Sequence, residues 1–374
     1  ARSAMSAAKK TLNVAMIGQG FMGRAHSNAF HQVGHFFDTP FELRRKVICG
    51  RNRETLDAMA ARWGWDETAT EWQAVVERKD IDVVDVATPN NLHAPVALAA
   101  AKAGKLLLCE KPLAMSVAEA EQMAAAARKV PNLVWFNYRR VPAIALAKRI
   151  MDEGRLGQVY HYRAVYLQSW GPEREGVWRF KKSVAGSGAM GDLLSHSIDL
   201  ALMLNGEISE LSAMLRTFAP PPRDVDDAVL LLARFANGSI GSFEATRYAI
   251  GRRNYNQFEI HGSKGMLRFN LEDLNRLEFF DSNDKQEILG AHQVLVTGPG
   301  HPYVDRYWPP GHIIGYEHTF ISTLADFLDA LAKNQPFHAN FDDATQVQRV
   351  LEAVEHSAAD GGWAKLGSSA RAAD

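Results

Sequence analysis

Three residues of this chain have the types and the spacing that proton transfer requires: Lys111, Asp192 and His196. Lys111 is the middle residue of a Glu-Lys-Pro tripeptide that directly follows the apolar run Leu106–Cys109. A short, continuous apolar run of this kind indicates a buried parallel strand. A lysine at the end of such a strand can hydrogen-bond a substrate hydroxyl and help to remove its proton.

Asp192 and His196 are four residues apart, so on a helix they share one face. A carboxylate beside an imidazole fixes the tautomer of the ring and raises its basicity, which suits a proton acceptor during alcohol oxidation. Glycines at positions 186, 188 and 191 are expected to leave room there for a ligand or a nicotinamide.

Glu110 precedes the lysine and is expected to pair with Lys111 or to hold the nicotinamide side of a cofactor. The bond between Lys111 and Pro112 is a candidate cis peptide, because proline makes the cis form accessible. A cis bond here would aim Lys111 into the cleft.

A glycine-rich turn near the start of the chain predicts a dinucleotide site. It follows an apolar strand and opens a helix, whose amino end offers amide donors and a positive dipole to phosphate. The first glycine permits the tight turn, the second lets the backbone approach a pyrophosphate, and the third lets helix pack on strand. The predicted cofactor residues of this turn are Gly18, Gly20, Phe21, Met22 and Gly23. His26, on the following helix, is expected to serve in packing or at the surface.

Two further turns are predicted to contact the cofactor. The second strand ends in Gly50, Arg51 and Asn52, without the acidic residue that NAD-preferring sites usually carry there, so NADP is expected to be tolerated and NAD is not excluded. The next strand ends in a turn beyond its carboxyl end, where ligands lie in open α/β sheets; its candidates are Thr88, Pro89, Asn90 and His93.

The elements around these motifs predict two domains. Short strands alternate with helices up to about residue 137, which indicates βαβ units and a doubly wound parallel sheet of the Rossmann type over residues 10–137. Residues 31–44 are longer than a minimal connection and are predicted to be an inserted surface loop. Longer alternating segments with glycine-bearing turns follow, which predict an α+β domain over residues 138–374 with a large, mostly antiparallel open sheet. The last helices are expected to pack back on the first domain.

Composition narrows the classes of partner. The 374 residues carry a formal net charge of −1, so nothing favours binding to nucleic acid or to an anionic membrane. The two cysteines are placed on separate strands, and the histidines lack the short spacing of a zinc site, so neither a disulfide nor a metal is expected. No apolar stretch has the length of a signal peptide core or a membrane span, so we expect a cytoplasmic protein.

At this point the chain resembles the glucose–fructose oxidoreductase / inositol dehydrogenase / MocA-type (Gfo/Idh/MocA) family over nearly its whole length. The motifs that carry the resemblance are the glycine turn, Thr88-Pro89-Asn90, Glu110-Lys111-Pro112, Asn137-Tyr138-Arg139-Arg140, Trp178-Arg179-Phe180 and residues 188–199. The resemblance implies hydride transfer between NAD(P) and a hydroxyl-bearing ring carbon of a sugar, anhydrosugar or cyclitol. It also implies a homo-oligomer, a dimer or tetramer, that associates through the open sheet of the second domain.

By the same motif match, the resemblance makes Lys111, Asp192 and His196 the catalytic residues and places Trp178 and Arg179 in the substrate pocket. The aromatic-rich segment 303–318 adds His312 as a candidate substrate contact, because sugar sites combine aromatic rings with hydrogen-bonding groups. Tyr138 and Arg139 are similar candidates. Gly50 in place of an acid is a departure from the family pattern.

The predicted chemistry is alcohol oxidation, in which His196, oriented by Asp192, takes the hydroxyl proton and Lys111 stabilises the developing alkoxide. The sequence leaves open whether His196 and Lys111 exchange these roles. It also leaves open a reductase of a keto-sugar or anhydro-ketosugar, a non-catalytic cofactor-sensing regulator on the same fold, and an enzyme with a permanently held cofactor.

Overall fold

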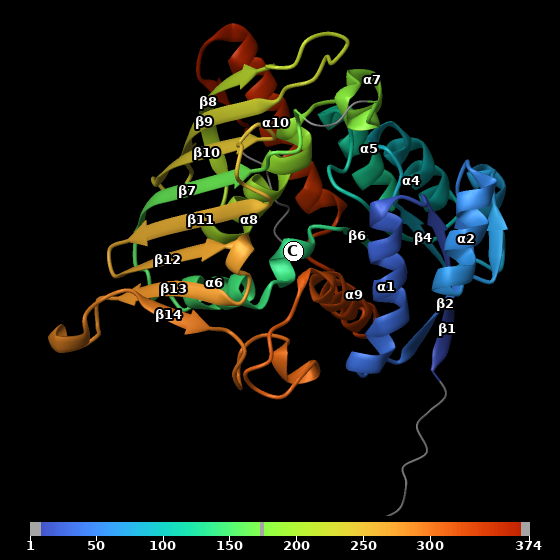
Figure 1. Cartoon of the computed structure of the whole chain (residues 1–374), viewed down its shortest axis with the longest axis horizontal. Coiled ribbons are helices and arrows are strands. Elements are labelled where there is room, and N and C mark those ends of the chain that lie inside the picture. Colours follow the sequence, from blue (N-terminus) through green and yellow to red (C-terminus); the bar gives the residue numbers. More distant parts are fainter. Residues whose placement is uncertain (1–8, 173–175, 368–374) are drawn as a thin grey trace, which may run out of the picture.

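The computed structural model describes residues 9–172 and 176–367, which form two domains, each built on one sheet (Figure 1). The first sheet is parallel, with strand order β3-β2-β1-β4-β5-β6, the order of a doubly wound dinucleotide-binding fold. Its strands are β1 (Lys10–Ile17), β2 (Phe41–Cys49), β3 (Glu67–Ala69), β4 (Val83–Val86), β5 (Leu106–Cys109) and β6 (Asn132–Val134). This confirms the Rossmann prediction, and it brings the carboxyl ends of β1, β2, β4 and β5 to one edge.

Helices connect these strands. They are α1 (Phe21–Phe36), α2 (Arg53–Trp63), α3 (Trp72–Val76), α4 (His93–Lys102) and α5 (Val117–Ala127). Local sequence signals set several of their ends: Asn52 caps α2, Ser116 caps α5, and each side chain accepts a bond from a backbone amide of the first turn. Cys49 and Cys109, at the ends of β2 and β5, are buried free thiols.

The predicted surface loop over residues 31–44 is wrong. The helix continues to Phe36, and β2 begins at Phe41, so only four residues connect them. The helix extends because its apolar period continues past Phe30, with Val33 buried and Phe36 packed against the core.

The second sheet has nine strands in the order β14-β13-β12-β11-β7-β10-β9-β8-β15. All its described pairings are antiparallel except that of β7 with β10, which confirms a mostly antiparallel sheet. The strands are β7 (Val159–Leu167), β8 (Ile208–Arg216), β9 (Ala228–Phe235), β10 (Ile240–Thr246), β11 (Tyr255–Gly262), β12 (Gly265–Asn270), β13 (Arg276–Asp281), β14 (His292–Leu295) and β15 (Ala364–Lys365).

One face of this sheet packs against helices, and two helices bridge the domains (Figure 1). The helix α9 lies on α1, and α10 lies on both α5 and β8. These later helices are α6 (Pro142–Asp152), α7 (Lys182–Ala185), α8 (Ser195–Asn205), α9 (Tyr316–Ala332) and α10 (Phe341–Asp360). Within the described ranges, none has the length and apolar character that a bilayer crossing requires.

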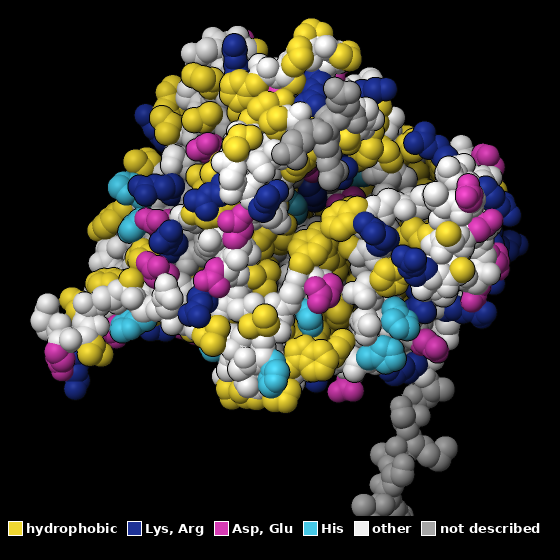
Figure 2. Space-filling model, viewed as in Figure 1, with side chains coloured by type: hydrophobic (Ala, Val, Ile, Leu, Met, Phe, Trp, Pro, Cys, Tyr) yellow, Lys and Arg dark blue, Asp and Glu magenta, His cyan; other side chains and the backbone are white. Residues whose placement is uncertain are grey.

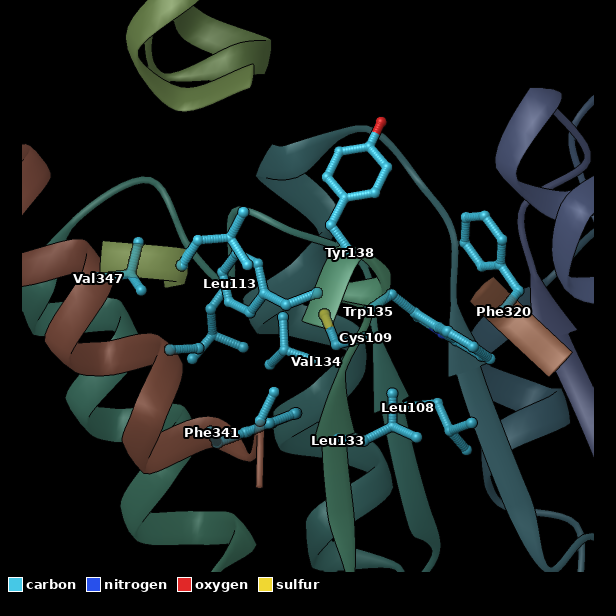
Figure 3. Close-up of a cluster of buried hydrophobic side chains, with 14 of the residues drawn as sticks. Leu108, Cys109, Leu113, Leu133, Val134, Trp135, Tyr138, Phe320, Phe341 and Val347 are labelled. Atoms are coloured by element: carbon cyan, nitrogen blue, oxygen red, sulfur yellow. The ribbon is translucent and has the colours of Figure 1, made fainter. Parts of the chain in front are cut away.

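A buried cluster lies where the two domains meet (Figure 3). Trp135, directly after β6, is fully buried and packs against Phe320 of α9, with 5.7 Å between ring centroids. Tyr138 points away from the cluster, towards the cleft described below. The chain between β6 and α6 therefore joins the core of one domain to the site between both.

An ion pair holds helix α8 in place. Arg139, in the 3-10 turn Asn137–Arg140, donates from Nε and Nη2 to the buried Asp199 carboxylate at 2.6–3.1 Å. Asp343 of α10 lies 3.5 Å from Nη1 of the same guanidinium. Because α8 also carries His196, this pair helps to fix the helix that positions His196. Arg139 itself does not line the cleft.

We expect Asp199→Ala to lower the free energy of unfolding by about 3–5 kcal/mol, because it leaves the Arg139 guanidinium buried without its main partner. Asp152→Ala is the matched control: it breaks the exposed helical pair with Lys148, which contributes little. Urea unfolding of both variants measures the difference. Equal stability of the two variants would contradict this role for the buried pair.

Candidate active site

A cleft of about 860 Å³ opens between the two domains, and Figure 2 shows the hollow on this face of the molecule. The carboxyl ends of β1, β2, β4 and β5 line one side, and the second domain lines the other. The predicted site residues in its wall are Gly18, Gly20, Phe21, Met22, Gly50, Arg51, Thr88, Pro89, Asn90, Glu110, Lys111, Trp178, Arg179, Asp192 and His196.

The glycine turn has the shape that a dinucleotide needs. Gly18 has φ +129°, and a Cβ there would lie 2.2 Å from the Ala87 carbonyl oxygen. A Cβ on Gly20 would meet nothing within 4 Å, so the backbone is open to a close ligand, whereas Gly23 packs against Gly18 and does not line the cleft. Helix α1 begins here without a side-chain cap, which leaves its first amides for a phosphate.

The end of β2 explains the missing acid. A Cβ on Gly50 would lie 1.7 Å from Oε1 of Gln19, so the Gln19 side chain occupies the space of a residue-50 side chain. Gln19 Nε2 donates to the Asn52 carbonyl, which leaves Oε1 as a buried acceptor without a partner among the described residues. Arg51 is exposed at the rim, and Asn52 serves as the cap of α2 outside the cleft.

The turn after β4 contributes three of its four predicted residues. Thr88, Pro89 and Asn90 line the cleft, and Asn90 also donates to the Ala185 carbonyl across the domain boundary at 2.8 Å. His93 does not line the cleft: it is fully buried, and its ring nitrogens lie 2.9 Å from the Pro112 carbonyl oxygen and 3.1 Å from the Thr88 carbonyl oxygen, one of which accepts the ring N–H. It holds two loops together instead of contacting the cofactor.

Lys111 meets Asp192 across the domain boundary. Its peptide bond to Pro112 is cis, and its Nζ donates to the backbone oxygen of Asp192 at 2.7 Å and to Oδ1 at 3.1 Å. An ammonium has three hydrogens, so one remains for a substrate hydroxyl.

Arg247, which the sequence analysis did not single out, is the second cation that binds the Asp192 carboxylate. It lies just beyond β10, is fully buried, and donates from Nη2 to Oδ2 of Asp192 at 3.0 Å. Burial alone would raise the pKa of Asp192, but Lys111, Arg247 and Arg179 hold that pKa well below its usual range. The only signal for Arg247 was its position just past the end of a strand.

Asp192 therefore does not orient His196 as predicted. Its two oxygens face Lys111 and Arg247, and no hydrogen bond joins it to His196 among the described residues. The cause is local geometry, because Asp192 lies in a π-helical turn (Met190–Leu194), whose wider winding changes which side chains share a face, and a stronger cationic partner is at hand.

His196 lines the cleft, and its surroundings favour a neutral imidazole. Its ring lies 4.5 Å from the ring of Tyr138, centroid to centroid. Burial and the Lys111 charge lower the pKa of His196 well below 6.5, with Asp192 opposing them only in part. A neutral imidazole can accept the proton of a hydroxyl.

The upstream glycines serve packing and not ligand space. A Cβ on Gly188 would lie 1.7 Å from the backbone oxygen of Asp226, whose carboxylate accepts the amides of Gly188 and Met190 at 2.6 and 2.7 Å. This tight contact fixes the start of the π-helical turn.

Aromatic and polar side chains form the rest of the substrate wall. Trp178 and Arg179 line the cleft as the family motif implied, with the guanidinium 4.4 Å from the Trp178 ring centroid. His312 is exposed outside the cleft and bonds the Pro309 carbonyl, so its predicted role as a substrate contact is not supported by its position. Further side chains on this side of the cleft include Tyr166, Gln168, Trp170, Arg247 and Asn254, together with Tyr316 of the aromatic-rich segment.

Two family models match most of the chain. One, described as the oxidoreductase family with an NAD-binding Rossmann fold, matches residues 12–138, and the GFO/IDH/MocA C-terminal domain matches residues 144–268. Levoglucosan dehydrogenase of Pseudarthrobacter phenanthrenivorans is 42% identical over 382 residues, which cover 95% of this chain and 98% of the relative.

Two further comparisons also point to sugar and anhydrosugar oxidoreductases. A solved levoglucosan dehydrogenase in complex with NADH and levoglucosan superposes with a TM-score of 0.93 at 43% identity, covering 96% of this chain and all of that one. The 1,5-anhydro-D-fructose reductase of Ensifer adhaerens is 34% identical over 66% of this chain and 78% of the relative. The chain therefore belongs to the Gfo/Idh/MocA oxidoreductase family, as its Glu-Lys-Pro and Asp-x-x-x-His motifs indicated.

Proposed function

We propose that this protein is an NAD-dependent dehydrogenase that oxidises a hydroxyl-bearing ring carbon of a sugar, anhydrosugar or cyclitol. The observation that carries the proposal is the meeting of Lys111, Asp192 and His196 in one cleft with the glycine turn. A bound nicotinamide would supply the hydride acceptor. An anhydrosugar such as levoglucosan is the first substrate to test, because two of the relatives act on compounds of that class.

The geometry favours one assignment of roles. His196, neutral because of burial and the nearby ammonium, takes the hydroxyl proton. Lys111, held by Asp192 with one hydrogen left over, stabilises the alkoxide that develops. Asp192 positions Lys111 instead of orienting the imidazole.

The reverse reaction is the second candidate. The similarity to an anhydrofructose reductase favours it, and the same two residues would then protonate the reduced carbonyl oxygen. Rates measured in both directions with one substrate pair distinguish the physiological direction from mere reversibility.

We expect Lys111→Ala and His196→Ala each to lower kcat/KM by about 10²–10⁴-fold, because each removes a group that moves or stabilises charge at the hydroxyl. Initial rates of NADH formation with levoglucosan and a panel of inositols and pyranoses provide the measurement. His312→Ala is the control, since that exposed side chain lies outside the cleft, and it should keep wild-type turnover. If both alanine variants bind NADH normally and keep full turnover, the assignment fails.

NADP is proposed as a tolerated second cofactor. The turn that follows β2, formed by Gly50, Arg51 and Asn52, carries no carboxylate, and Arg51 at the rim can pair with a 2′-phosphate.

We expect Arg51→Ala to lower kcat/KM for NADP by about tenfold, the size of a lost hydrogen bond to a charged group at an exposed site, and to leave kcat/KM for NAD nearly unchanged. Parallel rate measurements with the two cofactors test this. An equal loss for both would assign Arg51 to a part of the cofactor that NAD and NADP share.

The open face of the second sheet is proposed as an interface between copies of this chain. Leu230 of β9 and Met214 of β8 are cross-strand neighbours, 50% and 67% exposed, and Leu232 is 57% exposed. Figure 2 shows hydrophobic side chains at the surface over these upper strands. Apolar patches of this kind mark protein interfaces.

We expect Leu232→Asp to shift the protein towards the monomer, because it places a charge in the centre of the buried apolar contact. Light scattering during size-exclusion chromatography gives the molar mass. Ile313→Asp, which alters an exposed residue between β14 and α9 and outside the sheet, is the control. A wild-type protein that is monomeric at all concentrations would refute the interface.

A further inference from the structure

A second polar cluster lies beneath the cleft, and the chemistry described above does not use it. His26 of α1 is fully buried, with Nδ1 2.8 Å from Oδ2 of Asp85 in β4 and Nε2 3.0 Å from Oε1 of Glu110. The other oxygen of Asp85 accepts from Trp135 Nε1 at 2.9 Å. The other oxygen of Glu110 accepts from the Lys111 amide at 3.1 Å.

This arrangement constrains the charge of the imidazole. Both ring nitrogens face carboxylate oxygens, and only a doubly protonated ring can donate to two carboxylates at once. Although burial opposes protonation, Asp85 and Glu110 raise the pKa of His26 to about 9. Two aromatic rings also pack near the imidazole: Trp135 stacks on it with 4.3 Å between centroids, and the Phe320 centroid lies 5.7 Å away.

Two residues in contact with this cluster, Glu110 and Trp135, line the cleft, and Glu110 is the one directly beside Lys111. Glu110 is buried, yet it lines the cleft beside Lys111. A buried carboxylate without a partner would be costly, so Glu110 depends on His26 for its place. His26 and Asp85 themselves do not line the cleft, so any effect they have on the cofactor must pass through a neighbour that does, Glu110 or the stacked Trp135.

We propose that His26, clamped between Asp85 and Glu110, is a positioning residue for the nicotinamide end of the site. It fixes the Glu110 carboxylate, and Glu110 in turn fixes the Lys111 backbone and the wall against which the nicotinamide lies. The inference rests on the proposed dinucleotide function of the cleft. In this proposal helix α1 has two roles. Its amino end binds the phosphates of the cofactor, and His26, about one turn further along, positions the residues around the nicotinamide.

A comparison of NADH with ADP-ribose separates binding at the nicotinamide end from binding at the rest of the dinucleotide site. ADP-ribose fills the phosphate and adenosine parts of a dinucleotide site and lacks the nicotinamide. Calorimetric titration of His26→Gln should show NADH binding weakened about tenfold, as expected for the loss of a charged hydrogen bond, and ADP-ribose binding nearly unchanged. Phe30→Leu is the matched control, a buried change one turn along the same helix with no polar contact to the cluster.

A pH series separates a charged clamp from a merely structural histidine. Because the pKa of His26 is raised in the folded protein, the excess thermal stability of the wild type over His26→Gln should be fully present below pH 6.5 and lost as the pH rises through about 9. Asp85→Asn removes one charge of the clamp and should move this loss to lower pH. It serves as the second variant if His26→Gln does not fold.

The possible results distinguish the positioning role from its alternatives. Equal weakening of NADH and ADP-ribose, or no weakening of either, overturns the positioning role, as does a stability difference that does not change with pH. Absence of turnover with any ring polyol would count against the proposed substrate class and would leave the NADH and ADP-ribose comparison intact.

Discussion

The ion pair between Lys111 and Asp192 is the interaction on which the site depends. Lys111 comes from the end of a strand in the first domain and Asp192 from a helical turn in the second, and their side chains meet at 3.1 Å. Arg247 holds the other carboxylate oxygen, so the pair cannot rearrange without leaving a buried charge unmatched. The contact therefore sets the distance between the cofactor domain and the substrate wall, and it leaves His196 neutral beside an ammonium.

Polar groups buried beneath the cleft support this arrangement from both sides. On one side, His26 and Asp85 hold Glu110, which precedes Lys111. On the other, Arg139 holds Asp199 on the helix that carries His196. In each cluster the attraction between buried charges is largely offset by the cost of removing them from water, whereas loss of one partner would leave a buried charge unmatched. Such polar contacts matter in a cleft between two domains, because apolar packing alone does not position a side chain as accurately as a directional hydrogen bond does.

Backbone crowding is the second constraint on the site. Gly18 approaches the Ala87 carbonyl and Gly188 approaches Asp226 so closely that neither position can hold a side chain. Gln19 fills the space beside Gly50 that an acidic residue would otherwise need. These contacts show why a larger residue could not be placed at these positions without moving a neighbour.

The sequence by itself determined the two-domain fold, the glycine turn and the candidate trio, because strand and helix periods and short motifs are local signals. The sequence analysis was wrong about side chains whose partners are distant in the chain. The i, i+4 spacing suggested that Asp192 orients His196, but a π-helical turn and Arg247, 55 residues away, direct the carboxylate elsewhere. His93 and His312 looked like site residues, yet one is buried between loops and the other is exposed. His26 looked like packing, and only the folding of β4 and β5 beside α1 brings two carboxylates to its ring. Which charges meet is decided by the tertiary structure, because the partners of a buried side chain come from strands and helices far apart in the chain.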